Sequence, residues 1–330
     1  MRKRITRPAM ALLFALIALL PLGPAAGQEA ALPEACQELA FSTEEDFVMR
    51  EGKPLDGDPY ISDGDLLTSG ATVCARNTQL LQQFDVSADL GLDAADVISA
   101  TGNIVAFSTE LDSPNGDQFT AGDLLITNGS VIPNSALTTR FGPIHDLGLD
   151  AIHFVGPRDR ILAFLDEWSR EPGILADMLE QHDIDIWFSV EGTWTPATAA
   201  GFYDGDLLSA REGKVVAHGE ELLPPAVPAG LPSRGVDFGL DAATGTRKDD
   251  VEQIAFSTEI LHNDGFSFTD GDVLAYGKEA VLHTNEELVK SFTPAAAFLG
   301  LDALHLTPVE WLPNDLYLPL ILKAFGSPNQ

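Results

Sequence analysis

Short stretches of alternating apolar and polar residues recur four times along the chain and predict β-strands. In the last copy, Ile254 and Phe256 place bulky apolar side chains on one face of the segment IAFSTE. This period of two is typical of a half-buried strand. A Gly-Asp turn entering apolar residues follows, then a short segment around Val281, and then an LDA segment. Each copy therefore predicts four short antiparallel strands joined by Gly-rich turns.

Three landmarks with an acidic residue each keep the same order in all four copies. The FSTE landmark contributes Glu44, Glu110, Glu191 and Glu259. The GDLL landmark contributes Asp65, Asp123, Asp206 and Asp272, and the GLDA landmark contributes Asp93, Asp150, Asp241 and Asp302. The repeats span about residues 36–94, 95–151, 152–242 and 243–306, within a repetitive domain at 28–306.

The two ends of the repeated region are complementary. The first copy has no GLDA strand ahead of its FSTE strand, and the last copy has no FSTE strand behind its GLDA strand. Pairing of 301–306 with 39–44 would leave no open edge between them. This pattern predicts an all-β fold, a four-bladed β-propeller closed by pairing of the N- and C-terminal strands. A row of small β domains and a β-sandwich are the competing architectures.

The third repeat carries an extra segment at 157–183. Apolar residues spaced three and four apart on both sides of Pro172 and Gly173 predict a short helical hairpin. Such an insertion serves either an individual function or the covering of an exposed core edge. A tail at 307–330 follows the last repeat and is interpreted either as a processing or attachment signal or as a packing segment.

The motifs carry two resemblances. Across the mature chain, FSxE, DGDLL and LGLDA resemble the repeats of a group of exported bacterial proteins, which implies export and no particular activity. The four-copy plan is also similar to that of hemopexin-like four-bladed propellers, which are binding modules with ions in the channel. The chain lacks the FFxGDxYW block of those repeats, so the resemblance transfers no site residue.

The N-terminus and the charge set the expected location. Basic residues precede an apolar run from Ala9 to Leu20, and small residues follow, which predicts a signal peptide at 1–27 and a secreted or cell-surface protein. The mature chain would carry 15 basic and 50 acidic residues, a formal charge of −35. Such a charge disfavours nucleic acid and anionic membranes as partners. No later stretch is long enough to span a membrane.

The two cysteines, Cys36 and Cys74, both lie in the first repeat. Export favours a disulfide between them. If the strands near Phe41 and Leu67 form an antiparallel hairpin, paired positions have a constant sum, and the sum for the two cysteines is close to that for Phe41 and Leu67. The bridge would staple the end of this hairpin.

The repeated carboxylates allow two interpretations. An Asp at a turn accepts backbone N–H bonds that would otherwise lack partners, and this structural role is expected for the FSTE and GDLL acids. The four GLDA aspartates are the candidate metal ligands, because four such strands could meet near an axis and Ca²⁺ prefers oxygen ligands. His153 and His305 follow two of them by three residues, where the other repeats have Asp96 and Thr244. Because threonine is a poor transition-metal ligand, half-buried strand histidines are favoured there over a transition-metal site.

No catalytic motif such as HExxH, GxSxG or a Walker loop is present. The sequence therefore predicts a secreted acidic binding or structural module of the cell envelope or extracellular matrix, stabilised by Ca²⁺. Its partner would be an extracellular protein or a polysaccharide. The alternative is an extracellular hydrolase, similar to a glycosidase, that uses paired carboxylates.

Overall fold

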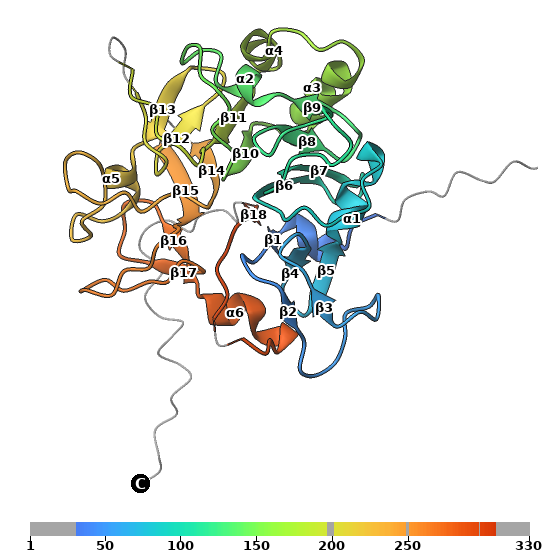
Figure 1. Cartoon of the computed structure of the whole chain (residues 1–330). Helices are drawn as coiled ribbons and strands as arrows, with labels where there is room; N and C mark the ends of the chain where they lie inside the picture. The colour runs from blue at the N-terminus through green and yellow to red at the C-terminus, as the bar shows by residue number, and fades with distance from the viewer. Residues whose placement is uncertain (1–30, 197–200, 249–250, 297, 308–330) are drawn as a thin grey trace, which may run out of the picture. The chain divides into compact units, whose positions relative to one another are not determined.

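The strands of the repeats pair into small antiparallel sheets (Figure 1). The computed structural model describes residues 31–196, 201–248, 251–296 and 298–307. The predicted signal peptide and nearly all of the predicted tail lie outside these ranges. Among the described residues, no helix is long and apolar enough to cross a bilayer.

Four of the sheets have four strands each, named below from one edge of the sheet to the other. The first contains β18 (Leu304–Leu306), β1 (Leu39–Phe41), β4 (Leu66–Thr68) and β5 (Thr72–Ala75). The second contains β6 (Ala94–Ser99), β7 (Ile104–Ser108), β8 (Leu124–Ile126) and β9 (Val131–Ile132). The third contains β10 (Ile152–Val155), β11 (Asp185–Phe188), β12 (Leu207–Ser209) and β13 (Lys214–Ala217). The fourth contains β14 (Ala242–Lys248), β15 (Val251–Ser257), β16 (Val273–Ala275) and β17 (Val281–His283). A separate pair joins β2 (Phe47–Val48) to β3 (Tyr60–Ile61).

Each four-stranded sheet begins with the strand that follows a GLDA landmark. That strand pairs with an FSTE strand, as Ala94 opposite Ser108 shows for β6 and β7. The terminal strands follow the same rule, because Leu39 lies opposite Leu306 and Phe41 opposite Leu304. The first and last described strands are therefore neighbours in one sheet.

The prediction of an all-β, four-bladed propeller is wrong. The described chain is a mixed α and β structure, and its strands form five separate small sheets, none of which closes on itself. The four larger sheets end at the edge strands β5, β9, β13 and β17. The prediction placed helices only at 157–183, whereas residues such as Asn77, Leu80 and Phe84, spaced three and four apart, also form helical turns.

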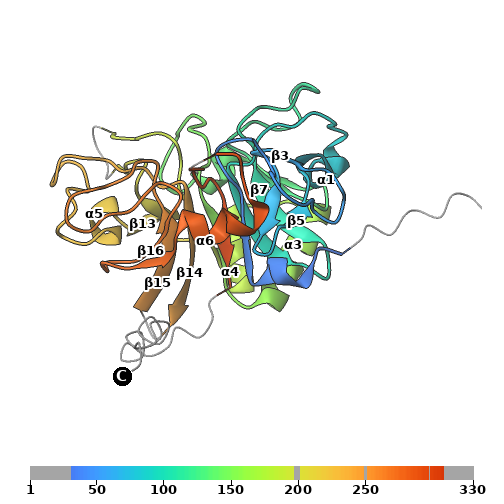
Figure 2. The same ribbon diagram turned by 90° about the horizontal axis from the view of Figure 1, so that it is seen from below.

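The helices lie mainly between the fourth strand of a sheet and the next GLDA landmark. The α-helices are α1 (Asn77–Leu80), α2 (Asn134–Leu137), α3 (Arg158–Arg170), α4 (Leu175–His182), α5 (Gly219–Leu222) and α6 (Asn285–Val289). The 3₁₀-helices are η1 (Glu34–Gln37), η2 (Gln82–Phe84) and η3 (Lys290–Phe292). The segment 157–183 contains α3 and α4, which contact each other and lie side by side in Figures 1 and 2. Their apolar faces bury Phe164, Trp168 and Leu179 against the second and third sheets.

The first strands of the four sheets pack together. Strand β6 contacts β10 and β18, and β14 also contacts β10 and β18. Figure 1 shows these four strands toward the middle and β5, β9, β13 and β17 farther out. In each FSTE landmark the serine hydroxyl donates to the leucine carbonyl of the GLDA landmark that begins the neighbouring sheet. The four O···O distances are 3.2 Å for Ser42 to Leu92, 2.9 Å for Ser108 to Leu149, 2.9 Å for Ser189 to Leu240 and 3.5 Å for Ser257 to Leu301. A cycle of buried hydrogen bonds therefore links the sheets.

The apolar core lies between neighbouring sheets. The phenylalanines of the four FSTE landmarks are completely buried: Phe41, Phe107, Phe188 and Phe256. Complete burial of such a side chain stabilises the fold by roughly 2–3 kcal/mol, which accounts for the aromatic position in every copy.

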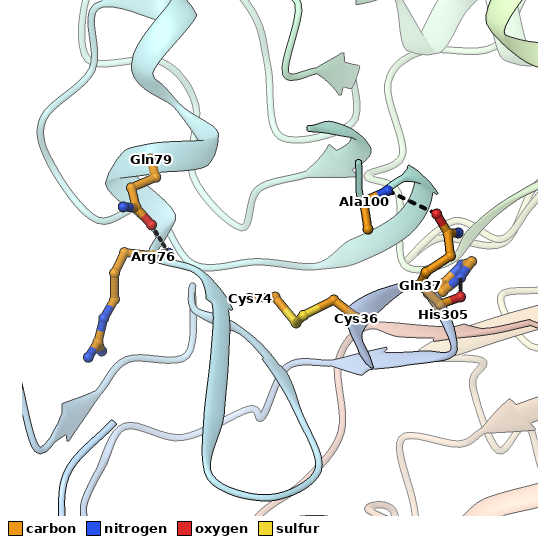
Figure 3. Close-up of a disulfide and its surroundings, with 7 residues drawn as sticks. All are labelled: Cys36, Gln37, Cys74, Arg76, Gln79, Ala100 and His305. Atoms are coloured by element: carbon orange, nitrogen blue, oxygen red, sulfur yellow. Dashed lines mark hydrogen bonds between the residues drawn. A yellow bond between two sulfur atoms is a disulfide. The ribbon is translucent and has the colours of Figure 1, made fainter. Parts of the chain in front are cut away.

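A disulfide joins Cys36 to Cys74, as predicted (Figure 3). Phe41 lies opposite Leu67 in the sheet, so the register assumed for the prediction is also present. Beside the bridge, Gln37 accepts the Ala100 N–H at 2.9 Å and donates to the Val97 carbonyl at 2.8 Å. The bridge and Gln37 therefore fasten η1 to the first and second sheets.

Candidate functional site

The four GDLL aspartates hold turns together. Asp123 Oδ2 accepts the N–H of Thr120 at 2.9 Å, and its Oδ1 accepts the N–H of Asn134, the first residue of α2, at 2.8 Å. The same two kinds of bond occur at Asp65, Asp206 and Asp272. Each of these carboxylates therefore accepts one bond from its own turn and one from the start of the helix that follows.

The four FSTE glutamates lie against glycines of the GLDA landmarks. A Cβ built at Gly148 would collide with Oε1 of Glu191, and Gly148 has a φ of +82°. The equivalent pairs are Gly91 with Glu110, Gly239 with Glu259 and Gly300 with Glu44. Glycine leaves room for the glutamate in all four pairs, and at Gly91, Gly148 and Gly239 it also permits the positive φ.

The four GLDA aspartates, Asp93, Asp150, Asp241 and Asp302, stand just before the four strands that pack together. The Oδ2 atoms of Asp93, Asp150 and Asp241 are buried and have no hydrogen-bond partner among the described residues. A buried carboxylate oxygen without a partner is costly, so each of these atoms calls for a proton, a water molecule or a cation. We refer to the four aspartates and the four FSTE glutamates together as the carboxylate cluster.

Burial and mutual repulsion shift the titration of this cluster. Burial, with the charges of Glu191 and Glu110, raises the pKa of Asp93 to about 8. Burial, followed by the charge of Asp93, raises the pKa of Asp302 to about 9. The pKa values of Asp150 and Asp241 are raised well above the ordinary range, first by burial and then by neighbouring acids.

The glutamates respond in the same direction. The pKa values of Glu44 and Glu110 are raised to about 7, first by burial and then by nearby acids. Those of Glu191 and Glu259 are also raised, mainly by burial. The interacting acids come from all four sheets, so the cluster titrates as a coupled set.

The predicted metal ligands do not form a ready-made metal centre. Within the described ranges, no group of three or more His, Cys, Asp or Glu side chains is placed to hold a metal ion. A hard cation such as Ca²⁺ takes six to eight oxygen ligands, including carbonyls and water. An ion at the carboxylate cluster would therefore complete its shell with such oxygens.

A second polar group lies three residues farther along the same strands, about 10 Å at the usual rise of a strand. Asp96, His153 and His305, which we call the polar triad, come from β6, β10 and β18 and are buried. Asp96 Oδ1 lies 2.6 Å from His305 Nδ1, and Asp96 Oδ2 lies 3.3 Å from His153 Nδ1. Thr244 occupies the equivalent position on β14 and lies 3.3 Å from His153 Nδ1.

The remaining ring nitrogens of the polar triad face backbone carbonyls. His153 Nε2 lies 2.6 Å from the Gly245 oxygen, and His305 Nε2 lies 3.0 Å from the Gln37 oxygen (Figure 3). Burial alone would raise the pKa of Asp96, but the charge and hydrogen bond of His153 and the hydrogen bond of His305 outweigh it and hold the pKa well below its usual range. Asp96 is therefore ionised.

The polar triad forms part of the wall of a cavity of about 170 Å³. The polar lining also includes Gln37, Arg158, Thr246 and Thr307, and the apolar lining includes Val97, Ile98, Phe154 and Ile161. His153 and His305 occupy two of the four equivalent positions noted in the sequence. Their contact with Asp96, at a third of these positions, was missed, because the equivalence does not reveal which side chains turn toward one another.

The FSTE serines were also missed. Their repetition in all four copies was visible, but a serine in a strand gives no signal of the neighbour to which it donates.

A scan against protein-family models, a search of curated proteins and a search of solved structures found no match to this chain.

Proposed function

We propose that this protein is a secreted acidic binding or structural module of the cell envelope or extracellular matrix, and that a divalent cation, Ca²⁺, stabilises it at the carboxylate cluster. The disulfide supports a location outside the cytoplasm, where such bonds persist. The proposed partner is an extracellular protein or polysaccharide.

The observation that carries the cation proposal is the set of partnerless oxygens on Asp93, Asp150 and Asp241. Their positions are equivalent, and each precedes a strand that packs against two other such strands. Hydrogen bonding among the described residues does not satisfy these atoms. A divalent cation would satisfy several of them at once and reduce the repulsion among the acids.

Protons and Ca²⁺ compete for the cluster. The raised pKa values mean that protons satisfy the aspartates in a medium without cations. Binding of Ca²⁺ would release those protons, because the ion binds the ionised form. At the Ca²⁺ concentrations found outside cells, sites with dissociation constants of about 10⁻⁴–10⁻³ M are occupied.

The test is a thermal melting series on the mature protein at pH 7.5, with excess chelator and with millimolar CaCl₂. We expect Ca²⁺ to raise Tm, by the free energy RT ln(1 + [L]/Kd). The variant Asp150→Asn should lose most of this increase. Asp117→Asn is the matched control, since Asp117 is an exposed loop acid outside the cluster.

An equal Tm in chelator and in Ca²⁺ would remove the cation from the proposal. A rise that survives in Asp150→Asn and is lost in Asp117→Asn would place the ion elsewhere. In either case the binding role would need other support, such as retention of the protein on extracellular polysaccharide.

A hydrolase is the second candidate, and one observation favours it. The pKa values of Glu44 and Glu110, about 7, suit a general acid near neutral pH. The substrate would be an extracellular polysaccharide, cleaved with a second carboxylate of the cluster. A screen of polysaccharides should then find activity that Glu44→Gln or Glu110→Gln abolishes, whereas activity unchanged in both variants would exclude this assignment.

A further inference from the structure

The cavity beside the polar triad has an unusual charge for so acidic a protein. Most of the molecule carries excess carboxylate, with 50 acidic and 19 basic residues in the sequence. The cavity wall instead combines two histidines and Arg158 with one acid, Asp96.

Hydrogen-bond accounting assigns the protonation of His305. Its Nδ1 faces the carboxylate of Asp96, and its Nε2 faces the backbone carbonyl of Gln37. Neither acceptor can donate a proton, so both ring nitrogens carry hydrogen and the ring is an imidazolium.

The same reasoning applies to His153. Its Nε2 faces the carbonyl of Gly245. Its Nδ1 faces Asp96 and the hydroxyl of Thr244, and that hydroxyl donates to the Leu306 carbonyl at 3.1 Å. Thr244 can therefore only accept from the ring, and His153 is an imidazolium too.

Two imidazolium groups and one carboxylate leave the triad with a charge of +1. A buried charge without compensation is expensive. The carboxylate cluster compensates it poorly, because its nearest aspartates lie about 10 Å away along the strands and burial raises their pKa values, which favours the uncharged form. The positive end of α3, which begins at Arg158 on the cavity wall, adds to the positive potential.

We propose that this cavity is a binding site for a small organic carboxylate. The anion would neutralise the triad and contact Arg158 at the mouth. Its body would lie against the apolar part of the wall, to which Val97, Phe154 and Ile161 belong. A cavity of about 150 Å³ in another protein holds benzene, so the 170 Å³ here suits a ligand of about the size of a six-membered ring.

A carboxylate fits this wall better than inorganic phosphate. Phosphate has no apolar surface, so the apolar part of the wall would stay in contact with water. A sugar acid offers both a carboxylate and a ring. The site is separate from the carboxylate cluster, so its occupancy does not depend on Ca²⁺.

The test is calorimetric titration of the intact mature protein with D-glucuronate, D-glucose and inorganic phosphate, each with and without CaCl₂. We expect glucuronate to bind at least tenfold more tightly than the other two probes, with little change on addition of CaCl₂. Arg158→Gln should weaken glucuronate binding at least fivefold. Arg170→Gln, at the other end of α3 and also exposed, is the matched control and should leave it unchanged.

His305→Gln tests the triad itself and should abolish glucuronate binding. If that variant does not fold, the Arg158→Gln result decides. Equal binding of glucose and glucuronate, tighter binding of phosphate, or no binding of any probe would overturn the proposal. So would equal effects of the Arg158 and Arg170 substitutions.

Discussion

Replacement of Asp93 by asparagine should change how stability depends on pH. Asparagine has the shape of a protonated aspartate and carries no charge at any pH. In the native protein, burial and the charges of Glu191 and Glu110 raise the pKa of Asp93 to about 8. In the unfolded chain the pKa returns to about 4.

The sign of the effect follows from which state holds the proton more tightly. The folded protein does, so the stability from this group is complete below the unfolded pKa and falls as pH rises from about 4 toward 8. At about 1.4 kcal/mol per pH unit, the loss between pH 4 and pH 7 reaches about 4 kcal/mol for one independent group. Coupling with the other acids of the cluster divides this loss among them.

The assay is thermal and urea unfolding from pH 4 to pH 7 in buffer stripped of divalent cations. Wild type should lose stability over this range, and Asp93→Asn should lose less by as much as about 4 kcal/mol, roughly 8 °C in Tm at about 2 °C per kcal/mol. Asp117→Asn should follow wild type. Equal losses in wild type and Asp93→Asn would refute the raised pKa and the buried, repulsive surroundings from which it follows.

Three further changes test the packing around the site. Cys36→Ser should reduce the free energy of unfolding by about 4 kcal/mol in the chain-entropy estimate, since the bridge spans 38 residues, and dithiothreitol should then have no added effect on Tm. Gly148→Ala should lower the free energy of unfolding by about 1–3 kcal/mol more than Gly116→Ala does. Both glycines have positive φ, but only at Gly148 does the added Cβ collide with Glu191. Equal losses in the two variants, measured by urea unfolding, would contradict the contact. Ser189→Ala should lose about 1–3 kcal/mol by leaving the buried Leu240 carbonyl unpaired, and an unchanged midpoint would mean that this bond contributes nothing.

Local pattern predicted the strands and their partners more successfully than the whole fold. The alternation around Phe107 and Phe256 reports which side of a strand is buried, and that is a property of neighbouring residues. The register of Phe41 with Leu67 and the Cys36–Cys74 bridge followed from simple counting along an antiparallel pair. The helical turns at Asn77 and Asn285 were overlooked because each is only about one turn long.

The chemistry of the site depended on contacts that no local pattern contains. Repetition pointed to the four GLDA aspartates, but only the structure reveals the partnerless oxygens on Asp93, Asp150 and Asp241. The link between Asp96 and the two histidines joins residues up to 209 positions apart. Such pairs form where strands from different repeats pack, and the sequence of one repeat carries no record of its neighbour's side chains.

Calorimetric titration of CaCl₂ into the cation-free protein comprising residues 28–330 at pH 7.5 tests the cation at the carboxylate cluster most directly. The prediction is one Ca²⁺ bound per chain, accompanied by proton release that varies with the ionisation enthalpy of the buffer, and loss of this binding in Asp150→Asn. Absence of binding, or binding of the same strength in Asp150→Asn as in wild type, would contradict it.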